Sequence, residues 1–455
     1  MTKAGPRSLL ELIAQSSTLE SAWRSVRRRS SSSSSGLDKI TLTDFARNWQ
    51  QKKKVIRQRL LDKSYKFTPY LGQPLKKKTH ANPYNLKEWR PISIATISDR
   101  VVQRAILNRI WKDIRHKVHT EVSFGGIRKY KIRSRRHTIE VKKVEEDEPK
   151  SVLNAAKRIV ELREKDYNWV FETDIENFFP TVDRGKLFAE LFPMLRDNSI
   201  NHLIESALDT SIANAAQLGL LSNLWDPTIG VPQGGVLSPM LANFYLFEHD
   251  KILIDAGFHL IRYVDDLVIL TQSEQQARAA YRTCKLALEK IGLNIHPLGL
   301  NSNGRIKTNI RAPSESFDFL GLTFCSNSIR PMQSKFGSLH ERLMQITETQ
   351  GRKDSLFTVI QQVNWCVRGW VKAYNFCNLS RRHLELIDQQ AAFFIRRWLQ
   401  RRGLIAKINK LDNEAYGWIE IERAQDIFIN PILKPVKYRI KEFTKTHVPN
   451  KLQPA

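Results

Sequence analysis

The spacing of apolar residues divides the 455-residue chain into a mixed middle region and a helical C-terminal region. Between about 151 and 325, helix-like segments alternate with short β-branched or aromatic runs, the clearest of which are 169–171, 260–263 and 267–270. Runs of this kind are typical of strands in a small sheet. From about 333 onward, apolar residues recur with the 3.6-residue period of amphipathic helices. The pattern therefore predicts a mixed α/β region followed by an all-helical one.

Two stretches of biased composition interrupt this pattern. Residues 30–35 are all serine, which is typical of a flexible linker or loop. Residues 131–150 begin with a basic run and end with an acidic one, so they can bury little apolar surface and are predicted to form an exposed insertion. With these breaks, we expect a basic N-terminal segment with its linker (1–35) and a C-terminal tail (403–455) around the folded regions.

The charge of the chain is far from balanced. Lys and Arg number 73 against 46 Asp and Glu, which gives a net charge of +27 at pH 7. A field of this sign points to a polyanionic partner. The excess is dense in residues 1–80, where 18 Lys and Arg face 5 Asp and Glu, with lysine runs at 52–54 and 76–78. Each run is either a solvated face or part of a phosphate-contacting surface.

The cysteines and the hydropathy bear on the compartment. Four cysteines lack paired spacing, which favours reduced thiols over a disulfide framework or a metal finger (Cys284, Cys325, Cys366 and Cys377). No apolar run reaches 18 residues, and the N-terminus has no signal-peptide pattern. We therefore expect a soluble protein in the cytoplasm without a membrane partner.

Candidate chemistry is concentrated in three aspartates. Asp265 and Asp266 lie between two apolar runs, which predicts the tip of a tight hairpin. Adjacent carboxylates repel, and a divalent cation removes that cost; a solvent-exposed turn without a metal is the alternative. Asp174 closes another strand-like run and supplies a third carboxylate. A strand-end carboxylate and a hairpin pair suit two Mg²⁺ ions about 4 Å apart, which need few protein ligands beside substrate oxygens.

Motifs around these aspartates resemble a known family. Residues 263–266, Tyr-Val-Asp-Asp, look like the catalytic hairpin of reverse transcriptases, and 174–179 resemble their first catalytic segment. Residues 230–246 are similar to the segment between them, in the form used by group II intron and related bacterial enzymes. Four further elements follow the same order: fingers segments at 89–94 and 99–105, a primer-grip hairpin at 317–322 and the start of the thumb at 368–374. The resemblance covers about residues 36–399.

The resemblance implies an α+β right-hand polymerase. Fingers would span 36–165 with the charged insertion near 131–150, a palm with a small antiparallel sheet 166–325, and a helical thumb 326–402. The implied activity is RNA-directed DNA polymerisation from dNTPs to a cDNA product by a two-metal mechanism, with Mg²⁺, or Mn²⁺ as the alternative ion. The implied template is a dedicated structured non-coding RNA. Some stand-alone bacterial relatives serve in defence against phages.

The resemblance also assigns roles to individual residues. The metal site comprises Asp174, Ile175, Asp265 and Asp266, of which Asp174 and Asp265 are the principal ligands, while Asp266 binds one metal or shapes the turn. Residues of the nucleotide pocket are Arg90 at the triphosphate, Phe179 beneath the sugar, Gln233, Gly234 and Tyr263. A ring at Phe179 would clash with a 2′-hydroxyl, although an ordinary core Phe fits the same pattern.

Three questions stay open on the sequence. Lys307 is a candidate proton donor to pyrophosphate, with Arg305 as its rival and a plain surface lysine as the alternative. No Cys/His-rich nuclease module follows the thumb segment, so we expect the DNA-cutting half of mobile intron enzymes to be absent. The competing functions are a maturase that binds intron RNA to assist splicing, and polymerisation that is primed by the protein itself or makes little use of a template.

Overall fold

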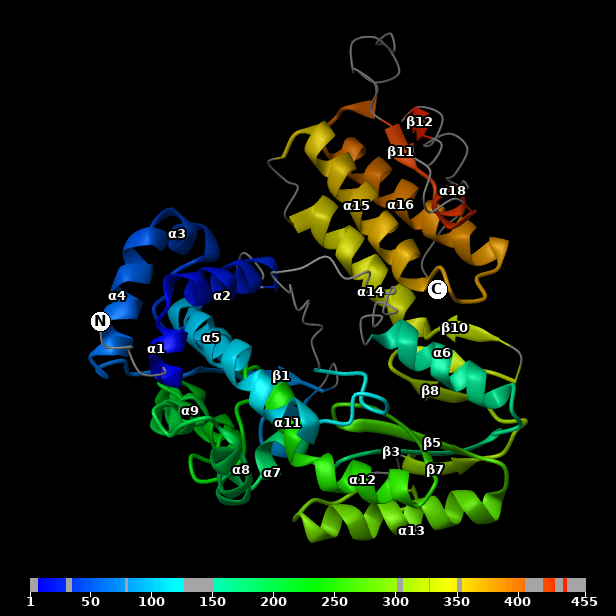
Figure 1. The fold of residues 1–455 in the computed structure, drawn as a ribbon. Coiled ribbons are helices and arrows are strands. Elements are labelled where there is room, and N and C mark those ends of the chain that lie inside the picture. Colours follow the sequence, from blue (N-terminus) through cyan, green and yellow to red (C-terminus); the bar gives the residue numbers. More distant parts are fainter. Residues whose placement is uncertain are drawn as a thin grey trace, which may run out of the picture. The chain divides into compact units, whose positions relative to one another are not determined.

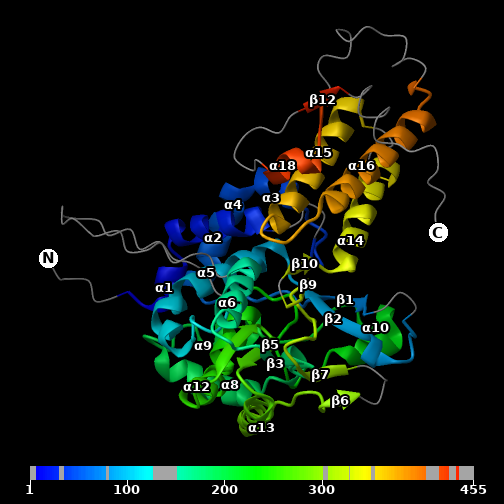
Figure 2. The same ribbon diagram turned by 90° about the vertical axis from the view of Figure 1, so that its right-hand side faces the viewer.

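The structure is a computed structural model that divides into two compact units, Met1–Ala312 and Pro313–Ala455 (Figures 1 and 2). It describes residues 7–29, 35–77, 81–126, 151–300, 306–326, 328–349, 354–405, 420–429 and 437–439. The charged insertion predicted near 131–150 and most of the serine run lie outside the described residues. Each unit is described by itself below.

The N-terminal part of unit 1 is a group of helices around α5 (Ile97–Ile114). The helices α1 (Leu9–Ile13), α2 (Ser16–Arg29) and α4 (Trp49–Leu61) each contact it, and α3 (Leu42–Arg47) precedes α4. Helix α5 is buried along most of its length and begins at Thr96, whose hydroxyl accepts the Asp99 amide at 3.2 Å. Although α2 and α4 carry many basic residues, their apolar sides pack into the core of unit 1.

A five-stranded antiparallel sheet forms the second part of unit 1, in the order β4-β5-β3-β7-β6. Its strands are β3 (Trp169–Asp174), β4 (His259–Tyr263), β5 (Asp266–Thr271), β6 (Gly299–Leu300) and β7 (Ile306–Arg311). Residues 267–270 of β5 are at most 1% exposed, because helices cover both faces of the strand. Helix α13 (Glu274–Lys290) contacts β3 and β5, whereas α6 (Val152–Arg163) lies across the sheet from it and contacts β4 and β5 (Figures 1 and 2).

A separate hairpin and short helices complete the described part of unit 1. Strand β1 (Leu71–Lys76) pairs antiparallel with β2 (Trp89–Ile94). The remaining elements are η1 (Leu86–Glu88), η2 (Arg115–Lys117), α7 (Phe178–Thr181), α8 (Arg184–Leu191), η3 (Phe192–Met194), α9 (Asn201–Ala207), α10 (Ala215–Leu218), η4 (Gly219–Leu224), α11 (Ser238–Tyr245) and α12 (Phe247–Asp255). The predicted α+β class, with a small antiparallel sheet and helices, is confirmed.

Unit 2 begins with a small sheet and continues as helices. Strands β8 (Phe317–Phe319), β9 (Leu322–Phe324) and β10 (Ile329–Pro331) form an antiparallel meander. Helices α14 (Gln333–Met344), α15 (Leu356–Tyr374) and α16 (Arg381–Arg401) contact one another, and a π-helical turn, η5 (Gln345–Thr349), extends α14. A short pair, β11 (Glu420–Glu422) with β12 (Lys437–Arg439), and α18 (Ala424–Ile429) follow. The boundaries predicted at 325 and 402 stay predictions.

Two further expectations concern thiols and membranes. All four cysteines are free, and Cys284 and Cys377 are buried, as the sequence indicated. In the described ranges, none of the helices has the length and hydropathy to cross a bilayer.

Candidate active site

The hairpin predicted at 263–266 is confirmed. Tyr263 ends β4, Asp266 begins β5 and the two residues pair across the strands, so Val264 and Asp265 form a two-residue turn. Val264 has a φ of 63°, and Asp265 is not among the residues with positive φ. Positive φ at the first central residue only is the pattern of a type II′ turn, where glycine is favoured. A β-branched residue is strained there, and such strain clusters at functional sites.

Asp174 lies next to this turn. It is the last residue of β3, and it sits directly opposite Asp266 in the register of β3 and β5. The following residue, Ile175, donates its amide to the Asp265 carbonyl at 3.1 Å. Two strand ends and a turn thus bring the three predicted carboxylate residues together at one edge of the sheet, with Ile175 between them.

The charges at this edge are not balanced. Burial, together with the neighbouring charges of Asp265 and Asp174, raises the pKa of Asp266 to about 6. Burial also raises the pKa of Asp265, and Asp174 adds to the effect. The cations of Arg90 and Lys307 act in the opposite direction on both groups. Ionised carboxylates are therefore costly here, and a further positive charge would stabilise them.

Asp174 has two basic neighbours. The Lys307 ammonium forms an ion pair with its Oδ2, and the His296 Nε2 lies 3.6 Å from its Oδ1. That Oδ1 is buried and accepts no hydrogen bond. Lys307 thus lies beside Asp174, and its role as a proton donor stays a prediction. Its rival Arg305 lies outside the described residues.

His296 is a site residue that the sequence did not identify. It reaches Asp174 because residues 294–295 lie beside the end of β3: Asn294 accepts the Glu176 amide at 2.8 Å, and Ile175 bridges Ile295. This contact depends on tertiary pairing between segments that are far apart in the chain. No local pattern around His296 signals it.

The residues fit a divalent cation, although they are not drawn together around one. Among the described residues, no three His, Cys, Asp or Glu side chains gather closely enough to hold a metal ion. Lys307 instead supplies the positive charge at Asp174. The buried Oδ1 without a hydrogen-bond donor, and two aspartates whose pKa values are raised, are the donor set that a hard cation with few protein ligands requires.

Three of the predicted nucleotide-pocket residues, Arg90, Gln233 and Gly234, lie on β2 or next to it. The Gln233 carbonyl accepts the Ser93 amide at 2.7 Å. Gly234 has a φ of 110°, and a Cβ there would come within 2.8 Å of the Ser93 carbonyl oxygen, so this close approach requires glycine. Arg90 lies on the same strand with an exposed side chain, and its charge acts on Asp265 and Asp266.

The two neighbouring phenylalanines occupy different environments. Phe178 is 2% exposed and belongs to the core, whereas Phe179 is only partly buried. The Phe179 carbonyl accepts the Val231 amide at 2.8 Å, which joins the start of α7 to the segment that carries Gln233. Of the two rings, only Phe179 is thus partly exposed.

Several known proteins are similar to this chain. Protein YkfC of Escherichia coli (strain K12) is 26% identical over 69% of this chain and 81% of its own length. The group II intron-encoded protein LtrA of Lactococcus lactis subsp. cremoris is 28% identical over 42% of this chain, which spans only 27% of LtrA. A solved chain of a partial Cas6-RT-Cas1–Cas2 complex is 22% identical, covers 63% of this chain and 42% of its own, and has a TM-score of 0.32.

A family-wide comparison is more decisive than these single relatives. The pattern of the family described as reverse transcriptase (RNA-dependent DNA polymerase) matches residues 75–324, which is more than half of the chain. The matched range contains the three aspartates, β2 and all five strands of the main sheet. The chain therefore belongs to the reverse transcriptase family and is, by class, an RNA-directed DNA polymerase.

Proposed function

We propose that the chain copies a dedicated structured RNA into cDNA by a two-metal mechanism at Asp174, Asp265 and Asp266. The observation that carries this proposal is the register of β3 and β5, which sets Asp174 opposite Asp266 beside the turn residue Asp265. The carboxylates of Asp265 and Asp266 carry charge that the fold does not balance, as their raised pKa values indicate. A site that stores uncompensated charge suits a charged ligand.

The proposed ligands of two Mg²⁺ ions are Asp174, Asp265 and Asp266, with Ile175 through its backbone; Mn²⁺ is the alternative ion. When bound, the ions would lower the pKa of the primer 3′-hydroxyl and stabilise the triphosphate and the departing pyrophosphate. Because Mg²⁺ keeps few protein ligands, the substrate oxygens complete the coordination in this proposal.

The proposed nucleotide contacts come from both sides of the turn. Arg90 binds the triphosphate, Lys307 gives a proton to pyrophosphate, and Gln233 and Gly234 line the pocket beside the sugar. Phe179 packs beneath the sugar and rejects a 2′-hydroxyl by steric clash, while Tyr263 flanks Asp266. The exposed side chain of Arg90 and its charge coupling to the aspartates support the first of these roles.

The proposed template partner is RNA, and cytoplasm is the proposed compartment. The net charge of +27 supports a polyanion partner. Because phosphate contacts release counterions, RNA affinity should fall by roughly 10³-fold or more between 50 and 200 mM salt if about six phosphates are contacted. An affinity that stays level over this range would contradict the basic surfaces as the binding site.

The direct test removes both turn carboxylates. We expect Asp265→Ala with Asp266→Ala to abolish metal-dependent dNTP incorporation on an RNA template. The matched control is Glu172→Gln, which removes one negative charge from the same strand as Asp174 but from a residue paired with Arg311 at 2.7 Å. Normal polymerisation by the double variant, with the control equally active, would overturn the proposal.

A second candidate function is a maturase that binds intron RNA to assist splicing. The similarity to the intron-encoded protein LtrA favours it. Splicing that survives loss of Asp265 and Asp266 would identify this role, because RNA binding does not need the carboxylates. Protease treatment of the cDNA, with a shift in its mobility, would detect priming by the protein.

Antiphage defence is the biological role that we attach to this proposal, on the resemblance alone. A host carrying the gene should show a lower plaque count than one carrying the Asp265→Ala, Asp266→Ala variant. Equal plaque counts would remove the defence role and leave the polymerase proposal untouched.

A further inference from the structure

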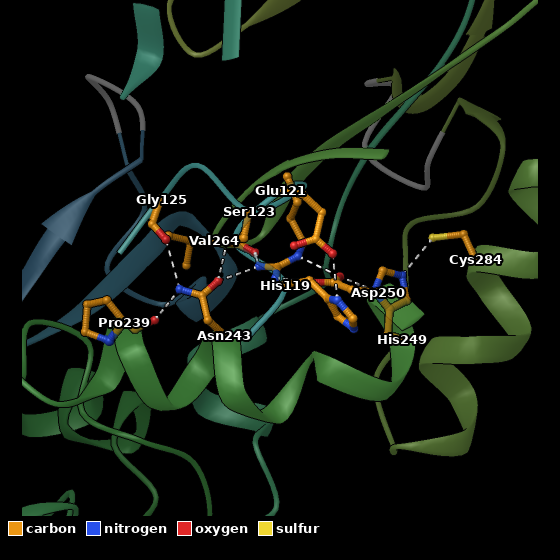
Figure 3. Close-up of polar contacts among 11 residues, drawn as sticks. His119, Glu121, Ser123, Gly125, Pro239, Asn243, His249, Asp250, Val264 and Cys284 are labelled. Atoms are coloured by element: carbon orange, nitrogen blue, oxygen red, sulfur yellow. Dashed lines mark hydrogen bonds and ion pairs between the residues drawn. The ribbon is translucent and has the colours of Figure 1, made fainter. Parts of the chain in front are cut away.

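A buried polar network around Asn243 and Asp250 reaches Val264, the residue before Asp265 in the turn (Figure 3). Arg262, the residue before Tyr263, is fully buried. Its guanidinium forms a forked ion pair with Asp250 of α12, with one Nε–Oδ1 distance of 2.9 Å, and donates through Nη1 to the Asn243 Oδ1 of α11 at 2.9 Å. A buried guanidinium in which all three nitrogens donate hydrogen bonds fixes geometry, because its donors lie in one rigid plane.

The same guanidinium reaches the strained turn. Arg262 Nη1 also donates to the Val264 carbonyl at 3.0 Å. Val264 is the residue with a φ of 63°, a conformation that valine does not adopt without a cost in free energy. The network therefore bonds to the one residue of the turn whose backbone needs an external support.

A second contact supports the turn from the other side. Asn243 donates through Nδ2 to the Gly125 carbonyl at 2.9 Å and accepts from the Ser123 hydroxyl at 2.7 Å. A Cβ on Gly125 would lie 2.8 Å from the Tyr263 ring and 3.0 Å from the Val264 side chain. The backbone that Asn243 holds thus packs closely against both residues that precede Asp265.

The far end of the network has no chemistry of its own. The His249 ring lies 3.0 Å from Asp250 and 3.5 Å from the Cys284 sulfur, an order that resembles a nucleophilic triad. All three side chains are fully buried, however, and burial raises the pKa of the Cys284 thiol well above its usual range. A thiol that stays protonated and out of contact with substrate is not a nucleophile.

We infer that Arg262, Asn243 and Asp250 are positioning residues that hold the Val264–Asp265 turn in its left-handed conformation and thereby place the Asp265 carboxylate. The inference rests on the proposed function, in which Asp265 is a metal ligand. A carboxylate displaced by about 1 Å from its productive position costs roughly 10²-fold in rate. The network is thus a part of the polymerase that never touches the substrate.

The test uses the conformational freedom of glycine. Arg262→Lys keeps the positive charge beside Asp250 but removes the Nη1 group that donates to the Val264 carbonyl. We therefore expect kcat to fall by about 10- to 100-fold with little change in the KM for dNTP. Adding Val264→Gly places glycine where positive φ is unstrained, and should restore kcat at least about fivefold in the Arg262→Lys background. If Arg262→Lys cannot be obtained folded, Asn243→Ser with and without Val264→Gly decides the same question.

Two controls separate positioning from general loss of stability. Cys284→Ala disturbs the other end of the network and should lower the melting temperature without lowering kcat. Mn²⁺ binding by electron paramagnetic resonance, without nucleotide, should weaken in Arg262→Lys and recover with Val264→Gly. A wild-type enzyme that does not polymerise would defeat the proposed function itself. An active wild type, with kcat unchanged in Arg262→Lys or with no rescue by Val264→Gly, would overturn the inference alone.

Discussion

The charged residues on the two sides of the hairpin turn, Arg262 with Asp250 and Asp265 with Asp266, differ in whether their charges are paired. Behind the turn, Arg262 and Asp250 are both fully buried and paired, and although burial alone would raise the pKa of Asp250, Arg262 holds it below its usual value. In front of the turn, Asp265 and Asp266 have raised pKa values, since burial and neighbouring aspartates act together. Behind the turn, the two opposite charges bind each other and so hold the structure. In front of the turn, the carboxylates of Asp265 and Asp266 stay available to bind a ligand.

The largest effect should come from neutralising the front of the hairpin. Asp265→Asn with Asp266→Asn keeps the size of both side chains and should reduce dNTP incorporation roughly 10³-fold or more, because the charges that hold the metals are gone. Stability should not fall, since two repelling charges are removed. Single-turnover incorporation measures the loss of activity, and urea unfolding measures the stability. A large loss of stability would place these aspartates among the structural charges instead.

Removing a carboxylate behind the hairpin should, in contrast, lower the stability of the fold. Asp250→Ala leaves the Arg262 guanidinium buried without its partner, which should cost about 3–5 kcal/mol in the free energy of unfolding. Urea unfolding of the full chain measures this loss. A variant that loses less than about 1 kcal/mol would show that water or another group takes over from Asp250.

Asp388 in unit 2 is a buried carboxyl whose pKa is raised, in contrast to Asp250, whose pKa is lowered by Arg262. Asp388 accepts the Ala424 amide at 2.7 Å, and burial raises its pKa to about 7. The folded state then keeps a proton that the unfolded state loses from about pH 4, so stability should fall as the pH rises from 4 to 7. Asp388→Asn should therefore be more stable than wild type at pH 8, by up to about 4 kcal/mol, with little difference at pH 4.

Chemical denaturation at both pH values measures this difference. Glu385→Gln, on the same helix and exposed, is the matched control and should show no comparable pH dependence. A gap between Asp388→Asn and wild type that is as large at pH 4 as at pH 8 would mean that the change acts through packing rather than through titration.

The smallest effect belongs to a partly exposed ion pair between two inner strands of the sheet. Glu172 and Arg311 lie on paired strands with a separation of 2.7 Å, and both are partly exposed. Glu172→Gln should change stability by less than about 1 kcal/mol, because solvent screens the pair. Thermal unfolding measures this change. A loss as large as that of Asp250→Ala would contradict the contrast between the fully buried pair and this partly exposed one.

Much of the front of the hairpin could be predicted from the sequence. Two aspartates between apolar runs define a turn, because strand alternation and turn length are local properties of the chain. Asp174 at the end of a strand-like run was equally visible. By contrast, His296 was missed, as was the network of Arg262, Asn243 and Asp250. From the sequence alone, an arginine within a strand is expected to lie at the solvent-exposed surface, and only the structure shows that Arg262 is buried.

By itself, the sequence determined the α+β class, the hairpin turn, the three aspartates and the family resemblance, because these depend on residue type and spacing over short stretches. Only the tertiary structure decided that Asp174 faces Asp266, that Lys307 and His296 reach Asp174, and that Arg262 is buried against α11 and α12. Those facts depend on strand register and helix packing between distant segments. The cost of a charge is set by what surrounds it, and the chain creates those surroundings only when it folds.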